Sequence, residues 1–374
     1  MPIDYNLLKV SIDLQAIQAN YRFLSSRGKR LIAVIKSDAY GHGLIPVGEA
    51  LAAVGADFFA VGTVEEAARL RPAVRGTVLA LLGPQSVEDI QIVAEQGILP
   101  LVARLDQLAG LEREAARLGR QIPIALKFDT GMARLGFAAA DVEAVARALG
   151  KMRLLRPEWL ISHLATADEP HQAEFVHEQA ARFQRIADRL ALAGHHPQRS
   201  LVNSGGLLAF PELAWNAQRP GIALYGANPF HGTDLAPLGR ELRPAMQVQA
   251  PVLAVHALPK GASISYGRTY VADMDKTVAI VAAGYADNYS RGLSNKGWML
   301  IRSQRAKILG RVCMQLTAVD VTEIAGVAPG DAAVLLGEQD GQAITPEELA
   351  SWWGTITYEV FCLLGMNRRE YATS

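Results

Sequence analysis

The sequence predicts an α/β protein, with a (β/α)8 barrel of the TIM type followed by a smaller, mostly β domain. From residue 31 to about residue 225, short apolar stretches alternate with amphipathic ones. That pattern is typical of buried parallel strands separated by helices, and eight such units fit a closed barrel. Beyond residue 244 the pattern changes to strands joined by turns. An open, doubly wound sheet is the alternative fold for the first part.

The expected barrel strands are short and almost entirely apolar. They cover residues 31–36, 57–62, 77–82, 98–102, 122–128, 159–164, 199–203 and 221–225. Helical periodicity predicts helices between them, at 44–54, 64–70, 87–96, 105–118, 141–149 and 172–193. The stretch after Ser204 has no clear period.

A crowd of prolines and glycines between Ala227 and Pro244 marks the junction between two domains. We therefore assign residues 1–235 to the barrel domain and residues 236–374 to a C-terminal β-rich domain. A closing helix begins at Pro346, because Thr345 and Glu348 have capping-box spacing, and runs towards residue 364. Strands of the second domain are expected at 246–258, 277–284, 298–302, 306–321 and 332–337.

Composition narrows the class of partner. Lysine plus arginine and aspartate plus glutamate each number 37 in 374 residues, so no excess positive charge is available for nucleic acid or an anionic membrane. A small-molecule partner is therefore expected. The two cysteines indicate no disulfide framework, and the eight histidines show no familiar metal-ligand spacing. With neither a secretory signal nor a membrane-spanning run, we expect a soluble cytoplasmic protein without a bound metal.

Polar residues gather where the predicted barrel strands end, which is the rim that carries active sites in such barrels. Lys36 lies at the end of the first strand, Lys127 near the end of the fifth and His163 near the end of the sixth, while Asn203 ends the seventh and Ser204 follows it. In partly dry surroundings a lysine amine has a lowered pKa and becomes a nucleophile.

Each of these residues also has a simpler explanation. Lys36 can extend its charged end from the strand to water, and Asp129 can pair with Arg134 to close a loop. His163 can be a satisfied core histidine, and Tyr266 can be an aromatic residue in an ordinary turn. Taken one at a time, the residues do not decide between these explanations.

Six segments taken together resemble the alanine racemase family, whose members are pyridoxal-phosphate enzymes built from a barrel and a β domain. They occur in family order: Lys36-x-x-x-Tyr40-Gly-His-Gly, Lys127-x-Asp-Thr-Gly-Met-x-Arg134-Leu-Gly, His163-x-Ala-x-Ala-Asp, Asn203-Ser204, Arg219-x-Gly-Ile222-x-x-Tyr-Gly and Ser265-Tyr266-Gly. The resemblance extends from about residue 10 to the last residues. One such match is weak, whereas six in order are specific.

The resemblance implies a role for each matching residue. Lys36 is similar to the lysine that carries the cofactor and serves one face of the substrate α-carbon, and Tyr266 to the base for the other face, which comes from the partner subunit. Arg219 resembles the arginine facing the pyridine nitrogen, and His163 and Arg219 together connect the tyrosine to that nitrogen. The residues similar to those that hold the cofactor phosphate are Tyr40, Ser204, Gly221, Ile222 and Tyr358.

The remaining family positions concern the substrate. Arg134 is similar to the arginine that meets the substrate carboxylate, and Lys127 to a lysine that is carbamylated and orients it. Met314 would complete the neighbour's site, so the resemblance implies a homodimer. Tyr285 and Tyr358 resemble residues that narrow the entrance.

The expected function is pyridoxal-phosphate-dependent interconversion of L-alanine and D-alanine by two bases, supplying D-alanine. One departure is Gln315, where the family usually has an aspartate, and it leaves serine or broader specificity open. A barrel-type decarboxylase for basic amino acids is less favoured, because its Glu-Pro-Gly-Arg and Cys-Asp segments are absent. A non-enzymatic cofactor carrier is a further alternative, and the second domain with its Tyr266 disfavours it.

Overall fold

The computed structural model describes residues 6–372, and its contacts divide these residues into two compact units. We call residues 17–39 and 44–242 the barrel unit. We call the described residues 6–16, 40–43 and 243–372 the β unit. The short segment Tyr40–Gly43 thus belongs to the β unit, although the chain on either side of it belongs to the barrel unit.

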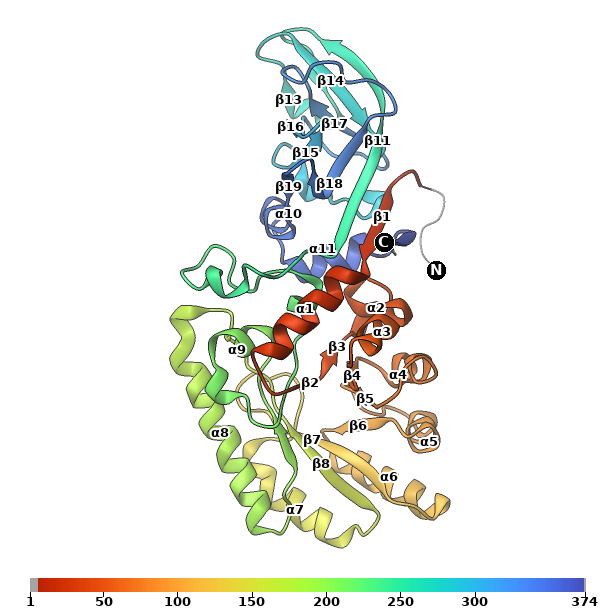
Figure 1. The fold of residues 1–374 in the computed structure, drawn as a ribbon, viewed down its shortest axis with the longest axis vertical. Coiled ribbons are helices and arrows are strands. Elements are labelled where there is room, and N and C mark those ends of the chain that lie inside the picture. The colour runs from red at the N-terminus through yellow and green to blue at the C-terminus, as the bar shows by residue number, and fades with distance from the viewer. Residues whose placement is uncertain (1–5, 373–374) are drawn as a thin grey trace. The chain divides into compact units, whose positions relative to one another are not determined.

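The barrel unit is built on parallel strands, which Figure 1 shows curling inside a row of helices. Seven strands form one sheet in sequence order: β3 (Ala33–Val34), β4 (Phe58–Val61), β5 (Thr77–Ala80), β6 (Leu99–Val102), β7 (Ile122–Lys127), β8 (Leu155–Ile161) and β9 (Gln198–Ser200). A further parallel pair joins β10 (Ala217–Gln218) to β2 (Arg30–Leu31). The Arg219 N–H donates to Val202 O at 3.0 Å, and the Val34 N–H donates to Pro220 O at 3.0 Å. These bonds connect the last strand to both ends of the sheet, so the predicted barrel is confirmed.

Helices α4 (Val64–Leu70), α5 (Val87–Gln96) and α6 (Leu105–Leu118) have the bounds that the periodicity predicts. Capping explains this agreement, because Thr63 forms a capping box at α4 while Gly97 and Gly119 end α5 and α6 in the left-handed conformation. The other helices associated with the barrel are α1 (Leu14–Ser26), α3 (Leu44–Ala53), α7 (Val142–Lys151), α8 (Ala173–Leu192) and α9 (Ser204–Ala209). No helix among residues 6–372 is long and apolar enough to span a bilayer.

The eighth strand was expected at 221–225, and this prediction is wrong. Those residues form the 3-10 helix Ile222–Tyr225, and the strand lies earlier, at β10. All four side chains of the 3-10 helix are buried, so their apolar character does not distinguish a strand from a tight helical turn. Pro220 has no N–H to offer a strand ladder, and Gly226 ends the turn with a φ of 86°.

The β unit contains a nine-stranded, mostly antiparallel sheet, shown in blue and cyan in Figure 1 with β1 in red. Its strands are β1 (Lys9–Asp13), β11 (Met246–Leu258), β14 (Lys276–Val281), β15 (Trp298–Ile301), β16 (Gln304–Lys307), β17 (Thr317–Asp320), β18 (Ala332–Gln339), β19 (Gln342–Ile344) and β20 (Arg369–Ala372). β1 pairs with β11 and with β20. A separate hairpin joins β12 (Ser263–Ile264) to β13 (Tyr270–Val271).

Two elements of the β unit differ from their predicted extent. The expected strand 306–321 is interrupted, because Gly310 adopts a φ of 73° and a loop separates β16 from β17. The expected closing helix is two helices, α10 (Pro346–Trp353) and α11 (Thr357–Leu364), since Gly354 takes a φ of 84° and caps the first. In both places a glycine in the left-handed region lies inside a predicted element and interrupts it, although the apolar pattern continues.

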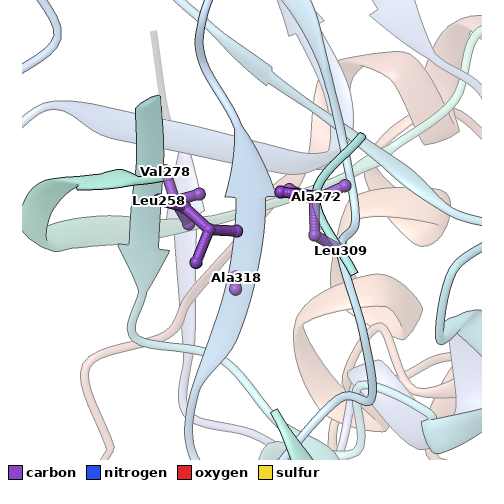
Figure 2. Close-up of a cluster of buried hydrophobic side chains, with 5 residues drawn as sticks. All are labelled: Leu258, Ala272, Val278, Leu309 and Ala318. Atoms are coloured by element: carbon purple, nitrogen blue, oxygen red, sulfur yellow. The ribbon is translucent and has the colours of Figure 1, made fainter. Parts of the chain in front are cut away.

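A small apolar cluster lies beside the β12–β13 hairpin. Figure 2 shows its five buried members, Leu258, Ala272, Val278, Leu309 and Ala318. The half-buried Ile264 and Tyr270, from the two hairpin strands, pack against it. A two-stranded hairpin is only marginally stable alone, so this contact is what holds it in a fixed place.

Candidate functional site

Lys36 follows β3 at the rim of the barrel, where its side chain is half-buried. The strand ends in register, because the Ile35 N–H donates to Ala60 O of β4 at 2.8 Å. The chain then makes one left-handed helical turn, which Figure 1 labels α2 (Lys36–Tyr40). Four consecutive non-glycine residues, 37–40, have φ values of 53–55°. Each costs about 1–2 kcal/mol relative to a right-handed conformation, so the surroundings must hold the turn.

Two carboxylates hold that turn within the barrel unit. Asp38 Oδ1 accepts the Leu44 N–H at 2.7 Å, and the Asp38 N–H donates to Glu66 Oε1 at 3.2 Å. The other oxygen of Glu66 accepts the Gly62 N–H at 2.7 Å, at the end of β4. The segment that follows Lys36 is therefore tied to the neighbouring strand and to the start of α3.

Arg219 is buried beside β10, with 4% of its surface exposed. Its Nη1 donates to Ser200 Oγ at 2.6 Å, and its Nη2 donates to the Ser162 and Leu201 carbonyl oxygens and lies 3.4 Å from His163 Nδ1. Burial lowers the pKa of the guanidinium to about 9, which still leaves it charged at neutral pH. The barrel thus holds a charged guanidinium in a fixed orientation, because groups at the strand ends accept its hydrogen bonds.

Lys127 and His163 lie in the same basic cluster. Burial lowers the pKa of Lys127 well below its usual value, and the nearby Arg219 and Arg134 add to the effect. Burial likewise lowers the pKa of His163 well below 6.5. The positive charges of Arg219, Lys127, Arg134 and Lys36 lower this pKa further. We call these five residues the basic cluster. An anion bound among them would relieve their mutual repulsion.

Arg134 is the exposed member of the basic cluster. The ion pair with Asp129 that would close its loop is not formed. Instead, Asp129 Oδ1 accepts the N–H groups of Gly131 and Met132 at 2.8 and 2.9 Å. Within the described chain, the Arg134 guanidinium therefore keeps its donors available for a carboxylate.

Ser204 lies at the start of α9, where it meets the turn after β10. Its buried Oγ accepts the N–H groups of Gly221 at 3.0 Å and Ala223 at 3.3 Å. Asn203 caps the same helix by accepting the Gly206 N–H at 3.0 Å. A hydroxyl and two backbone N–H groups thus converge at the rim, with the basic cluster in the same unit. This donor set, with its surplus of positive charge, fits a phosphorylated cofactor such as pyridoxal phosphate.

In the β unit, Tyr266 occupies the turn between β12 and β13 and is 68% exposed. It lines a surface pocket together with Cys313, Met314 and Gln315, and Met314 is 57% exposed. A second, more open pocket joins Tyr266 to Tyr285. The structure therefore brings Tyr266 close to both Met314 and Tyr285, although the three residues are separated in the sequence.

Tyr40 and Tyr358 also meet in the β unit, with ring centroids 5.9 Å apart and planes inclined by 43°. Tyr358 lies on α11, whose backbone approaches the same segment so closely that a Cβ on Gly41 would lie 2.3 Å from Phe361 O. The glycine directly after Tyr40 is therefore required by the passage of this helix.

Several supporting residues were not predicted. Ser162 and Ser200 hold Arg219, Glu66 supports the turn after Lys36, and Ser265 supports Tyr266. Ser162, Ser200 and Ser265 stand beside a predicted residue in the sequence or at a strand end, and Glu66 lies on α4, but the partner of each lies elsewhere in the chain. Among residues 6–372, no three histidine, cysteine, aspartate or glutamate side chains lie close enough to hold a metal ion.

Comparison with known proteins covers nearly the whole chain. Residues 12–229 match the family model of the alanine racemase N-terminal domain, and residues 245–371 match that of the C-terminal domain. An alanine racemase from Nitratidesulfovibrio vulgaris strain Miyazaki F is 53% identical over 99% of this chain and 100% of its own length. The alanine racemase structure from Streptomyces lavendulae has a TM-score of 0.90 at 33% identity, covering 99% of this chain and 98% of that one. The structure from Bartonella henselae, described with covalently bound pyridoxal phosphate, has a TM-score of 0.88 at 28% identity and covers 98% and 99%.

Proposed function

Because the chain belongs to the alanine racemase family, we propose that it interconverts L-alanine and D-alanine with pyridoxal phosphate, using two bases. The observation that carries the proposal is the basic cluster, in which Lys36 and His163 lie near the buried Arg219. The cluster combines an amine suited to covalent attachment with fixed positive charge for an anionic cofactor and substrate. D-alanine would then be the product supplied from L-alanine.

The cofactor, when bound, supplies an electron sink for the electron pair left at the α-carbon. Lys36 offers the amine for its attachment. Ser204 and the backbone of Gly221 and Ile222 would bind its phosphate, together with the phenols of Tyr40 and Tyr358. Arg219 keeps its charge and would face the ring nitrogen, where a cation disfavours protonation. Arg219 thereby favours return of the proton to the α-carbon over its delivery elsewhere.

Racemisation requires proton transfer on both faces of the α-carbon, because one group acting from one side tends to return the proton to the same face. Lys36 would serve one face, and Tyr266 of a second copy of the chain the other. The high exposure of Tyr266 and Met314 supports this homodimer, because these large side chains have little cover from their own chain. His163 and Arg219 would support the phenol by linking it to the cofactor.

Lys127 is proposed to carry a carbamate that orients Arg134. Its lowered pKa supports this, because the neutral amine is the form that attacks carbon dioxide; a nitrogen–carbon bond forms and one proton leaves. The product is an anion among cations, and it would direct Arg134 towards the substrate carboxylate. Native mass spectrometry in bicarbonate should show the added mass of one carbon dioxide in the wild type and none in Lys127→Met. An unmodified wild-type chain would contradict the carbamate.

Substrate size would be set by tyrosines at the entrance, Tyr285 and Tyr358. The exposed Gln315 lines the same pocket as Tyr266 and has a neutral side chain. A small change in polarity there is compatible with acceptance of serine, since one added hydroxyl changes selectivity by only about a hundredfold in a small pocket.

The decisive test follows the optical rotation of L-alanine in the presence of the purified protein and pyridoxal phosphate. Decay to zero rotation in the wild type, but not in Lys36→Ala, would support the proposed racemase. Unchanged rotation with bound cofactor would overturn alanine as the substrate, and the same assay with L-serine would follow. Carbon dioxide release from lysine or ornithine would instead identify a decarboxylase.

A further inference from the structure

Tyr266 is presented by an unusual turn. Ser265 before it has a φ of 69°, while Gly267 and Arg268 after it have φ values of 72° and 50°. Two of these three residues are not glycine, and a positive φ at such a residue costs about 1–3 kcal/mol. Such a turn persists only when its surroundings hold it in place.

The side chain of Ser265 makes the local attachment. Its Oγ donates to the Arg311 carbonyl oxygen at 2.6 Å and lies 3.4 Å from Cys313 Sγ. The opposing loop can approach because it has a glycine at this point: a Cβ on Gly310 would lie 2.7 Å from Ile264 O and 2.9 Å from Ser265 Cβ. The turn is therefore held against residues 310–313, and Met314 follows directly after this segment.

The two strands beside the turn are fixed by packing. Ile264 and Tyr270 rest on the apolar cluster of Figure 2, which includes Leu309, the residue just before Gly310. By contrast, the Tyr266 side chain is 68% exposed. The position of the phenol is thus determined mainly by the backbone that presents it.

We propose that Ser265 is a positioning residue for Tyr266, acting through its hydrogen bond to the Arg311 carbonyl. This inference rests on the proposed function, in which Tyr266 is one of the two bases. A displacement of about 1 Å at a reacting group can reduce a rate by roughly a hundredfold, so loss of one anchoring hydroxyl is measurable.

The two-base scheme provides a readout specific to Tyr266. In deuterated water, Lys36 removes the α-proton of one enantiomer. When Tyr266 is displaced and cannot act on the opposite face, Lys36 returns a deuteron to the face from which it took the proton. The carbon–hydrogen bond breaks and a carbon–deuterium bond forms, with the configuration retained. A displaced Tyr266 therefore raises the ratio of α-proton exchange to racemisation for that enantiomer, whereas damage to the whole site lowers both rates together.

The informative variants are Ser265→Gly, which accepts the backbone conformation, and Ser265→Ala, which keeps the conformational strain. Measured on the holoenzyme by NMR and chiral chromatography, both should racemise roughly tenfold to a hundredfold more slowly, with the exchange-to-racemisation ratio raised for one enantiomer. The matched control is Ser303→Ala. Ser303 has a φ of 61° and its hydroxyl donates to the Asp340 carboxylate at 2.6 Å, so the control loses a hydroxyl bond of the same length at another serine with positive φ, away from Tyr266. Its ratio should stay at the wild-type value.

A second readout does not depend on turnover. In the cofactor-free chain, amide deuterium uptake in residues 264–268 should be faster in Ser265→Gly than in Ser303→Ala or the wild type. A wild-type ratio in both Ser265 variants, or parallel loss of exchange and racemisation, would overturn the proposal. The variant Tyr266→Phe separates failure of the proposed base from failure of the proposed positioning residue. If Tyr266→Phe racemises alanine at the wild-type rate, the assignment of Tyr266 as a base fails. If Tyr266→Phe alone changes the ratio, only the role of Ser265 fails.

Discussion

Nη2 of Arg219 lies 3.4 Å from Nδ1 of His163, inside a barrel unit that buries the guanidinium and half-buries the imidazole. The same guanidinium donates to Ser200 Oγ and to two strand-end carbonyls, so it has little freedom to move away. A second positive charge on His163 is disfavoured at this distance. The pair is therefore one cation and one neutral imidazole at neutral pH.

His163 should make the cofactor-free protein sensitive to mild acid. Its pKa is lowered in the folded state, whereas in the unfolded chain it takes the ordinary value of about 6.5. Below that pH the unfolded chain binds the extra proton, so the free energy of unfolding falls as pH falls. The slope attributable to one group is at most about 1.4 kcal/mol per pH unit. Urea denaturation between pH 7.5 and 5.5, in cofactor-free wild type and His163→Gln, should show a steeper decline in the wild type. If the free energy of unfolding declined equally with pH in the two proteins, His163 would not be the cause of the acid sensitivity.

Lys127→Met should stabilise the cofactor-free chain and reduce racemisation. The folded state lowers the pKa of this amine, mainly by burial, so at neutral pH it bears a cost that the unfolded chain does not. Removing it should raise the free energy of unfolding by about 1–3 kcal/mol in buffer free of carbon dioxide. The difference should shrink as pH rises towards 10.5, where the unfolded lysine also loses its proton. A larger difference at pH 10 than at pH 7 would contradict this explanation.

Ser204→Ala should weaken cofactor binding more than it weakens the fold. The substitution leaves the buried N–H groups of Gly221 and Ala223 without their acceptor, at a cost of about 1–3 kcal/mol. Ser86→Ala is the matched control, since Ser86 accepts the Asp89 N–H at 3.0 Å as the cap of α5. Titration with pyridoxal phosphate, followed by absorbance, should give a raised Kd for Ser204→Ala and a wild-type Kd for Ser86→Ala. Equal Kd values for the two variants would show that Ser204 does not contribute to binding of pyridoxal phosphate.

Leu309→Ala should loosen the hairpin that carries Tyr266. Leu309 is buried in the cluster of Figure 2, and truncation of such a side chain costs about 2–5 kcal/mol. The control is Val271→Ala on the same hairpin, where the side chain is 49% exposed and the expected cost is smaller. Urea denaturation followed by tryptophan fluorescence measures the difference. If the two variants were equally stable, the cluster would not be what supports the hairpin.

The elements that the sequence predicts best are those with local signals at both ends. Helix α4 starts at a capping box and α5 ends at a left-handed glycine, so both bounds follow from nearby residues. β1 was not predicted, because its place in the sheet of the β unit depends on β11 and β20, which are far away in the chain. The misplaced eighth strand has the same origin, since Ala217 and Gln218 gain their register from β2.

The candidate site divides in a similar way. Residues that carry chemistry, such as Lys36 and Arg219, lie in motifs and can be named from the sequence. Residues that hold them cannot, because nothing near Ser200 or Glu66 in the sequence indicates that the fold brings Arg219 to the one and Asp38 to the other. Spacing along a chain reports local geometry, whereas these hydrogen bonds join elements that are far apart in the sequence.

The left-handed turn after Lys36 affects the order of folding. Residues 37–40 cannot form it by local preference, so it has to wait for Leu44 and Glu66 to be in place to accept or supply its hydrogen bonds. Its contacts should therefore be absent from the folding transition state and be among the first lost on unfolding. Substitutions at Asp38 would then change the unfolding rate more than the folding rate, and the neighbourhood of Lys36 would become ordered only when the barrel is essentially complete.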